Sequence, residues 1–197
     1  MFCAANGSGV VRRNSDGANS EELRANGHRQ HDPARLIWVS EREAVRAVFV
    51  DATGAVFLMR IIEPRSGQGW WITPGGGIEA GEIPLAALHR EAYEELGVDL
   101  AHIGTPKAVW HRRVAFSWDG GQFSQHETFY LIRCDRFDPP RCEDGDGQNS
   151  SVAGEPRWWT ATELRASSEN IAPAGLAELL ERLERDVPLQ TPRDISV

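Results

Sequence analysis

The chain has 197 residues, which is enough for one sizeable domain and too few for two of ordinary size. Hydrophobic residues make up 41% of the chain and charged residues 25%, as in soluble globular proteins. The formal net charge of −8 argues against a protein that binds nucleic acid through a basic face. It does not exclude a nucleotide ligand, because a divalent cation can lie between an acidic protein and a polyphosphate.

Membrane spans and disulfide-rich folds are not predicted. No stretch approaches the roughly 18 apolar residues that a membrane-spanning helix requires, and no secretory signal is recognisable. The cysteines, Cys3, Cys134 and Cys142, are odd in number and match no zinc-binding spacing. We therefore expect free thiols in a reducing compartment, and the predicted location is the cytoplasm.

The first predicted elements form a hairpin. Residues 1–35 are rich in Gly, Asn, Ser and Arg and are expected to form a disordered leader, followed by a domain over 36–190 and a tail over 191–197. Residues 43–50 and 55–61 have β-rich patterns, and the turn residues 51–54 lie between them. A polar loop over 63–69 and a glycine-rich segment over 70–77, too irregular for a strand, are expected next.

A helix is predicted from Pro84 to Leu96, because proline favours a first helical turn and Gly97 is a good C-terminal cap. Strands over 109–117 and 127–134, a polar loop over 135–154 and a short strand over 157–159 should follow. Two more helices are expected, one capped by Thr160 and ending at Arg165, the other over 174–185. This order predicts an α+β fold, a mixed β-sheet with helices on both faces.

The helix over 84–96 has an apolar face and an acidic face. At about 100° per residue, its core stripe falls within roughly 80°; the stripe consists of Leu85, Leu88, Ala92 and Leu96. Glu91, Glu94 and Glu95 form a second arc, centred about 110° away. Like charges at this spacing repel each other, and the helix dipole disfavours acids in a last turn. A cation would relieve both effects, so the arc is either a solvated surface or a site for Mg²⁺ or Mn²⁺.

The residues around this helix match a known motif. The motif has the spacing G-x5-E-x7-R-E-U-x-E-E-x-G-U, in which U is a bulky aliphatic residue. Its fixed positions are filled by Gly76, Glu82, Arg90, Glu91, Glu94, Glu95, Gly97 and Val98, and Ala92 stands at the first U position. The chain therefore resembles the Nudix hydrolase family over about residues 40–190. The resemblance implies a Nudix-type α/β/α sandwich. It also implies a metal-dependent enzyme that cleaves a pyrophosphate linkage in a nucleoside diphosphate linked to another moiety.

The resemblance also implies roles for individual residues. Glu91, Glu94, Glu95 and the backbone carbonyl of Gly75 would bind the metal, and Glu94 and Glu95 would also act in catalysis. Arg90 would orient the carboxylates, and Glu82 would brace the loop through Arg90. Outside the motif, Glu155 and Glu127 are candidates for an extra ligand or base, although an ordinary surface role is as well supported for each.

Substrate contacts are less well defined. Arg60 and Arg65 precede the motif and are candidates for phosphate binding, and Trp71 is a candidate for stacking on a base. A nucleoside triphosphate, a damaged nucleotide and a nucleotide sugar all fit the resemblance. The expected partner is thus a small nucleotide, with no nucleic acid polymer and no membrane, and a homodimer stays open.

Two other functions are compatible with the same fold. A non-catalytic nucleotide-sensing module is the main alternative, but such modules usually lack motif carboxylates, and all of them are present here. An isomerase would need a cysteine in its pocket, whereas Cys134 and Cys142 are expected at a strand end and in a loop. Metal-dependent hydrolysis is the predicted activity.

Overall fold

The computed structural model describes residues 39–138, 156–185 and 191–196. The expected leader over 1–35, most of the expected loop over 135–154 and Glu155 lie outside the described residues. In the parts that are described, no helix is both long enough and apolar enough to cross a membrane.

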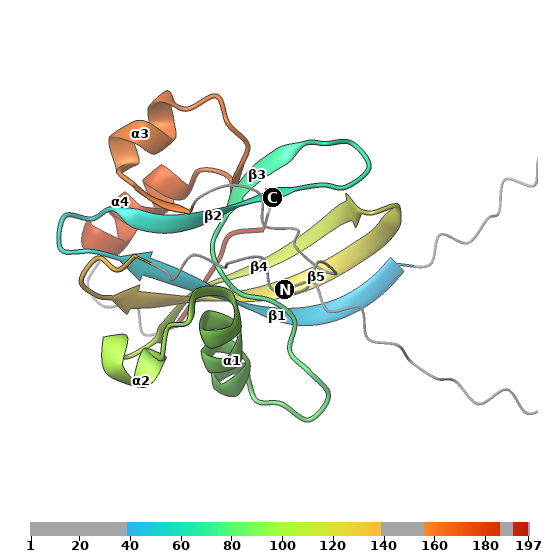
Figure 1. The fold of residues 1–197 in the computed structure, drawn as a ribbon, viewed down its shortest axis with the longest axis horizontal. Coiled ribbons are helices and arrows are strands. Elements are labelled where there is room, and N and C mark those ends of the chain that lie inside the picture. The colour runs from blue at the N-terminus through green and yellow to red at the C-terminus, as the bar shows by residue number, and fades with distance from the viewer. Residues whose placement is uncertain (1–38, 139–155, 186–190, 197) are drawn as a thin grey trace, which may run out of the picture.

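A curled mixed sheet forms the centre of the fold (Figure 1). The strand order is β7-β3-β2-β1-β5-β4-β8. β6 is not part of this order and pairs with β2. The strands are β1 (Val39–Val50), β2 (Val56–Ile62), β3 (Gly69–Ile72), β4 (Lys107–Trp118), β5 (Gly121–Arg133), β6 (Arg157–Trp159), β7 (Ile171–Ala172) and β8 (Arg193–Asp194). β1 runs parallel to β5, while β4 and β5 form an antiparallel hairpin.

Helices cover both faces of the sheet, as predicted (Figure 1). On one face, α1 (Pro84–Leu96) and α2 (Leu100–Ile103) pack with β1 in a core that contains Val45, Phe49 and Leu88. On the other face, α3 (Ala161–Ala166) and α4 (Leu176–Arg185) close a second core that contains Trp71, Trp110 and Trp159. Alternate residues of β1 therefore enter different cores, as the two-residue period of a strand requires.

The bounds of α1 agree with the prediction. Pro84 begins the helix, and Gly97 ends it in the left-handed conformation at φ 65°, with its N–H directed to the carbonyls of Ala92 and Tyr93. The predicted core stripe was wrong at one position, because Leu85 is 45% exposed. Leu85 lies in the first turn, and the buried face of the helix begins only at Ala87.

Several strands differ from the predictions. β3 forms within the segment that was expected to be irregular, because Trp70 and Trp71 pair with β2 and Trp71 also pairs with β7. The hairpin of β4 and β5 is longer than predicted, since its paired strands extend to a tight turn at Asp119 and Gly120. Within the expected tail, β8 pairs with β4. These features depend on partners that are distant in the sequence.

Asp51 closes the turn between β1 and β2. Its Oδ1 accepts hydrogen bonds from the backbone N–H groups of Thr53 and Ala55 at 2.8 and 2.9 Å, and its second oxygen pairs with Arg136. Burial opposes ionisation of this carboxyl, but the hydrogen bonds from Arg136, Thr53 and Ala55 outweigh it and lower the pKa of Asp51 from 3.8 to about 2.

Asp51→Asn is expected to lower the free energy of unfolding at pH 7, because the amide lacks the charge that Arg136 and the turn N–H groups bind. The folded-state pKa is depressed, so the contribution of Asp51 is complete above its unfolded pKa of 3.8 and is lost as the pH falls through about 2. Urea unfolding of both proteins from pH 7 downward should show a difference that shrinks below about pH 4. A difference that does not change with pH would contradict this role.

Candidate active site

The loop that precedes α1 lies alongside β1 and bonds to its backbone. Val45 N–H donates to the Gly76 carbonyl at 2.9 Å, and Ala47 N–H donates to the Pro74 carbonyl at 2.8 Å. Gly75 lies between them at φ +127°, where a Cβ atom would overlap the carbonyl oxygen of Val45. Backbone pairing with β1 thus fixes the loop next to the acidic side of α1.

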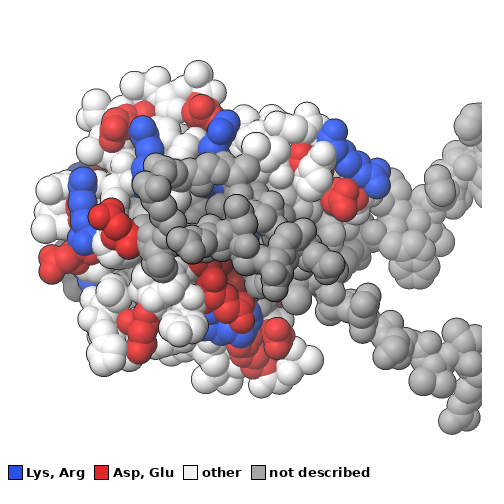
Figure 2. Space-filling model, viewed as in Figure 1, with Lys and Arg blue, Asp and Glu red and all other residues white. Residues whose placement is uncertain are grey.

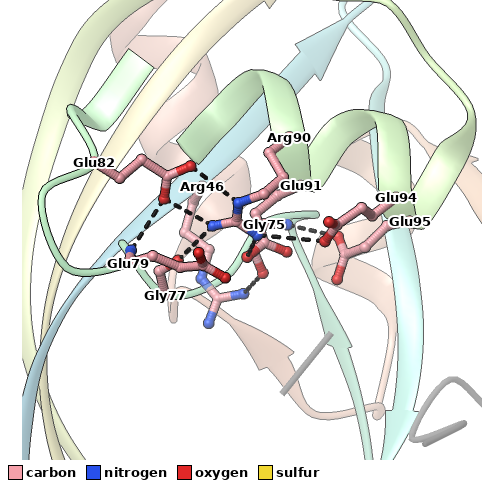
Figure 3. A network of polar contacts seen from close by, with 9 residues as sticks. All are labelled: Arg46, Gly75, Gly77, Glu79, Glu82, Arg90, Glu91, Glu94 and Glu95. Atoms are coloured by element: carbon pink, nitrogen blue, oxygen red, sulfur yellow. Dashed lines mark hydrogen bonds and ion pairs between the residues drawn. The ribbon is translucent and has the colours of Figure 1, made fainter. Parts of the chain in front are cut away.

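Arg90 lies at the centre of the site (Figure 3). Its Nε and Nη2 donate to the two oxygens of Glu82 at 3.0 and 2.9 Å. Nη2 also donates to the Gly77 carbonyl at 2.9 Å, and Nη1 donates to Glu91 at 2.8 Å and to Glu94 at 3.3 Å. The planar guanidinium therefore ties the loop to two carboxylates of α1, and the orienting role of Arg90 in catalysis stays a prediction.

The three glutamates of the arc are directed from α1 toward the Gly75 loop (Figure 3). Glu91 is only 2% exposed, whereas Glu94 is exposed and Glu95 half-buried. The carboxylate of Glu95 accepts a hydrogen bond from the Gly75 N–H at 2.7 Å. Figure 2 shows the result at the surface, where acidic and basic side chains lie together at the position of α1.

Charge compensation differs among these carboxylates. Hydrogen bonds from Arg90 keep the pKa of Glu82 below its usual value. Burial raises the pKa of Glu91, repulsion from Glu95 adds to the rise, and Arg90 opposes it. The bonds to Glu82 and Glu91 in turn raise the pKa of Arg90, so its charge is permanent. Arg90 thus bonds to both Glu82 and Glu91, and a divalent cation would add further positive charge beside the glutamates of α1.

The residues of the site fit a hard divalent cation. Among the described residues, no three His, Cys, Asp or Glu side chains are already gathered as a metal-binding cluster. Glu91, Glu94 and Glu95 are instead held by Arg90 and by the Gly75 N–H. Their donor atoms are all oxygens, as Mg²⁺ and Mn²⁺ prefer, and the lack of a side chain at Gly76 lets the Glu91 carboxylate lie directly against the loop.

A second polar network lies on the sheet beneath the loop. Glu127 on β5 is 2% exposed and accepts hydrogen bonds from Arg46 Nε at 2.9 Å, Arg112 Nε at 2.7 Å and Gln125 Nε2 at 2.8 Å. Burial favours the neutral acid, but the charges of Arg46 and Arg112 hold the pKa of Glu127 below its usual value. Arginine guanidinium groups thus bond to both oxygens of Glu127. This arrangement suits a residue that positions the arginines better than it suits a general base.

The candidates for substrate binding, Trp71, Arg60 and Arg65, make their described contacts elsewhere. Trp71 is 8% exposed and packs edge-on against Trp159 with ring centroids 5.0 Å apart, so the structure places it in the core and gives no support for stacking on a base. Arg60 lies on β2 opposite Trp71, with its guanidinium next to Gly69. Arg65 is exposed and pairs with Asp119 at 3.5 Å. Glu155 lies outside the described residues, so its role stays a prediction.

Sequence reasoning did not identify Arg46 as a site residue. Its Nη1 donates to the Gly75 carbonyl at 2.8 Å, and its side chain is 9% exposed (Figure 3). One signal was available, since Arg46 is a charged residue within an otherwise apolar stretch of strand that extends from Ala44 to Val50. Its partner Glu127 is 81 positions away, so the pair could not be recognised from the pattern of the strand alone.

Three consecutive glycines allow a matched test of the loop. Gly75→Ala should destabilise the fold by about 3 kcal/mol, because its backbone conformation is strained for alanine and its Cβ would overlap β1. Gly76→Ala should chiefly reduce activity, because its Cβ would lie 2.5 Å from Glu91 Oε1. Gly77→Ala is the control, since the nearest atom to its Cβ would be 4.0 Å away. Urea unfolding and turnover assays separate the three; equal effects at all three positions would contradict this geometry.

The chain is similar in sequence to curated proteins named RNA pyrophosphohydrolase. An RNA pyrophosphohydrolase of Helicobacter pylori is 35% identical over 74 residues, which cover 34% of this chain and 45% of the relative. An RNA pyrophosphohydrolase of Rickettsia africae is 30% identical over 98 residues, which cover 47% of this chain and 60% of the relative. The chain thus spans about half the length of the curated relatives it matches.

Solved structures share the fold. A MutT NUDIX hydrolase from Burkholderia pseudomallei superposes with a TM-score of 0.52 at 19% identity, covering 73% of this chain and 98% of that chain. A NUDIX-family hydrolase from Clostridium perfringens superposes with a TM-score of 0.50 at 17% identity, covering 75% of this chain and 99% of that chain. The model of the NUDIX domain matches residues 40–183. The chain therefore belongs to the Nudix family.

Proposed function

We propose that this chain is a metal-dependent hydrolase that cleaves a pyrophosphate linkage in a nucleoside diphosphate linked to another moiety. The observation that carries the proposal is the set of glutamates on α1, held by Arg90 and by the Gly75 N–H. Similarity to proteins named RNA pyrophosphohydrolase supports the same class of reaction. The proposed substrates are a nucleoside triphosphate, a damaged nucleotide or a nucleotide sugar.

The proposed ligands of Mg²⁺ or Mn²⁺ are Glu91, Glu94, Glu95 and the Gly75 carbonyl. When bound, the cation would neutralise the diphosphate and lower the pKa of an attacking water molecule. Arg90 keeps the carboxylates of Glu91 and Glu94 in place and bears a charge that offsets their repulsion. Glu82 holds the guanidinium of Arg90 with both of its oxygens, so its contribution to catalysis is indirect.

Proton transfer is assigned to the accessible part of the arc. Glu94 is exposed and Glu95 half-buried, so a water molecule can reach either carboxylate, whereas Glu91 is enclosed. We propose that one of these two accepts the proton of the attacking water. Glu127 is a less suitable base, because Arg46 and Arg112 occupy both of its oxygens.

A second candidate substrate is the 5′ end of an RNA. The names of the similar proteins support it, although the net charge of −8 favours a small nucleotide over a nucleic acid polymer. A 5′-triphosphate on RNA contains the same type of phosphorus anhydride, so the site would need no different chemistry. The choice between these substrates depends on residues outside the carboxylate arc.

A panel assay tests the proposed function. Purified protein with Mg²⁺ is incubated with nucleoside triphosphates, oxidised nucleotides, nucleotide sugars and a 5′-triphosphorylated RNA oligonucleotide, and release of phosphate or pyrophosphate is measured. We expect hydrolysis of at least one member and none in the presence of EDTA. Tight binding of a member without hydrolysis of any would contradict the proposal and favour a nucleotide-sensing module.

A further inference from the structure

A chain of buried and partly buried hydrogen bonds connects β4 with the carboxylate arc. Arg112 on β4 donates to Glu127 on β5, and Arg46 on β1 donates to the other oxygen of Glu127. Arg46 also donates to the Gly75 carbonyl at 2.8 Å, while the Gly75 N–H donates to Glu95 at 2.7 Å. Groups from β1, β4, β5 and α1 are therefore linked through the backbone N–H and C=O of one residue, Gly75.

The geometry of Arg46 suits this connection. Its Nε contacts Glu127 and its Nη1 contacts Gly75, so the two bonds leave one rigid, planar group in different directions. The side chain of Arg46 is 9% exposed and that of Glu127 is 1% exposed. Because both are enclosed, the guanidinium has little freedom to rotate away from the loop.

Charge explains why Glu127 is part of the chain. The Gly75 carbonyl is one of the proposed metal ligands, and an uncompensated arginine beside it would repel a cation. Glu127 pairs with Arg46 at 2.9 Å and also with Arg112, so it offsets part of the Arg46 charge and lowers the electrostatic cost of holding the carbonyl oxygen. A carbonyl oxygen has two lone pairs, and the bond from Arg46 uses only one of them.

We propose that Arg46 is a positioning residue for the metal site, and that Glu127 acts through Arg46 rather than on the substrate. Arg46 holds the carbonyl of Gly75 and thereby restricts the backbone of this residue, whose N–H bonds to Glu95. This inference rests on the proposed function, because it assigns Arg46 to the same carboxylate arc. The inference goes beyond the proposed function because Arg46 belongs to the sheet, whereas the proposed metal ligands belong to the loop and to α1.

The test compares Arg46→Gln, Arg46→Lys and Glu127→Gln with Arg113→Gln as the matched control, because Arg113 is exposed on the same strand as Arg112. Mn²⁺ binding to each folded protein is measured by calorimetry, beside kcat, KM and the thermal midpoint. Arg46→Gln is expected to weaken Mn²⁺ binding and to lower kcat by about 10- to 100-fold each, with KM little changed. The control should match the wild type.

Arg46→Lys distinguishes positioning from a merely structural role and is the variant to use if Arg46→Gln does not fold. Lysine restores the charge that Glu127 needs, but its single ammonium group lacks the planar fork that reaches Glu127 and Gly75 together. We expect Arg46→Lys to be stable and still to bind Mn²⁺ weakly. Normal Mn²⁺ affinity and normal kcat in Arg46→Lys would overturn the inference.

The double variant tests whether Glu127 acts through Arg46. Glu127→Gln should weaken Mn²⁺ binding in the wild-type background and have little further effect in Arg46→Gln. Additive effects would overturn this part of the inference. A wild-type protein that binds Mn²⁺ and hydrolyses nothing would overturn the proposed function alone, while the Mn²⁺ affinities would still decide the role of Arg46.

Discussion

Glu95→Gln is expected to lower kcat about a thousandfold, equivalent to about 4 kcal/mol of transition-state stabilisation, while the thermal midpoint stays close to that of the wild type. The amide keeps the shape of the side chain, and its oxygen can still accept the hydrogen bond from the Gly75 N–H. It lacks the negative charge that a metal ligand or a base requires. Steady-state kinetics with saturating Mg²⁺ give the size of the loss.

The matched control for this substitution is Glu169→Gln, which makes the same chemical change at an exposed residue between α3 and β7. Its kcat should equal that of the wild type. Near-normal Mg²⁺-dependent turnover in Glu95→Gln would show that the acidic arc is a solvated surface and that the metal site lies elsewhere. A loss of turnover together with a large fall in thermal midpoint would instead indicate a structural role.

Arg90→Met is expected to abolish activity and to lower the free energy of unfolding by about 3 kcal/mol. Methionine retains much of the apolar stem but removes every donor, which leaves Glu82 and the buried Glu91 without their shared cation. Arg90 then no longer reduces the repulsion among the glutamates of α1. Urea unfolding measures the stability, and the Mg²⁺-dependent rate measures the activity.

Two further substitutions define the role of Arg90. Arg90→Lys keeps the charge but cannot bond both oxygens of Glu82 and the Gly77 carbonyl at once, so part of the stability and little of the activity should return. Arg182→Met, at an exposed position on α4, is the control and should leave both unchanged. If Arg90→Met has the same urea unfolding midpoint as the wild type, the hydrogen bonds of Arg90 do not stabilise the fold.

The features that the sequence predicted correctly depend on local chemistry. Pro84 and Gly97 determine where α1 begins and ends, because each satisfies the backbone requirements of its own position. The same holds for α3, where Thr160 and Glu163 form a capping box. The spacing of Arg90 and Glu94 along one helix also fixes their proximity without knowledge of the rest of the fold.

The features that were missed depend on pairing across long stretches of chain. β3 was expected to be irregular because its glycine-rich surroundings conceal the pairing of Trp70 and Trp71 with β2. Arg46 was missed because Glu127 reaches it only through the parallel pairing of β1 with β5. The exposure of Leu85 reflects the point at which α1 meets the sheet, which helical periodicity alone cannot locate.

The most direct test of the central claim is ³¹P NMR of the best substrate of the panel, incubated with the protein and Mg²⁺. The predicted result is that the resonances of the phosphorus anhydride disappear and those of the two phosphate-containing products grow, with no change when EDTA replaces Mg²⁺. Anhydride resonances that persist for every nucleotide, or that vanish equally fast in EDTA, would contradict metal-dependent pyrophosphate hydrolysis at Glu91, Glu94 and Glu95.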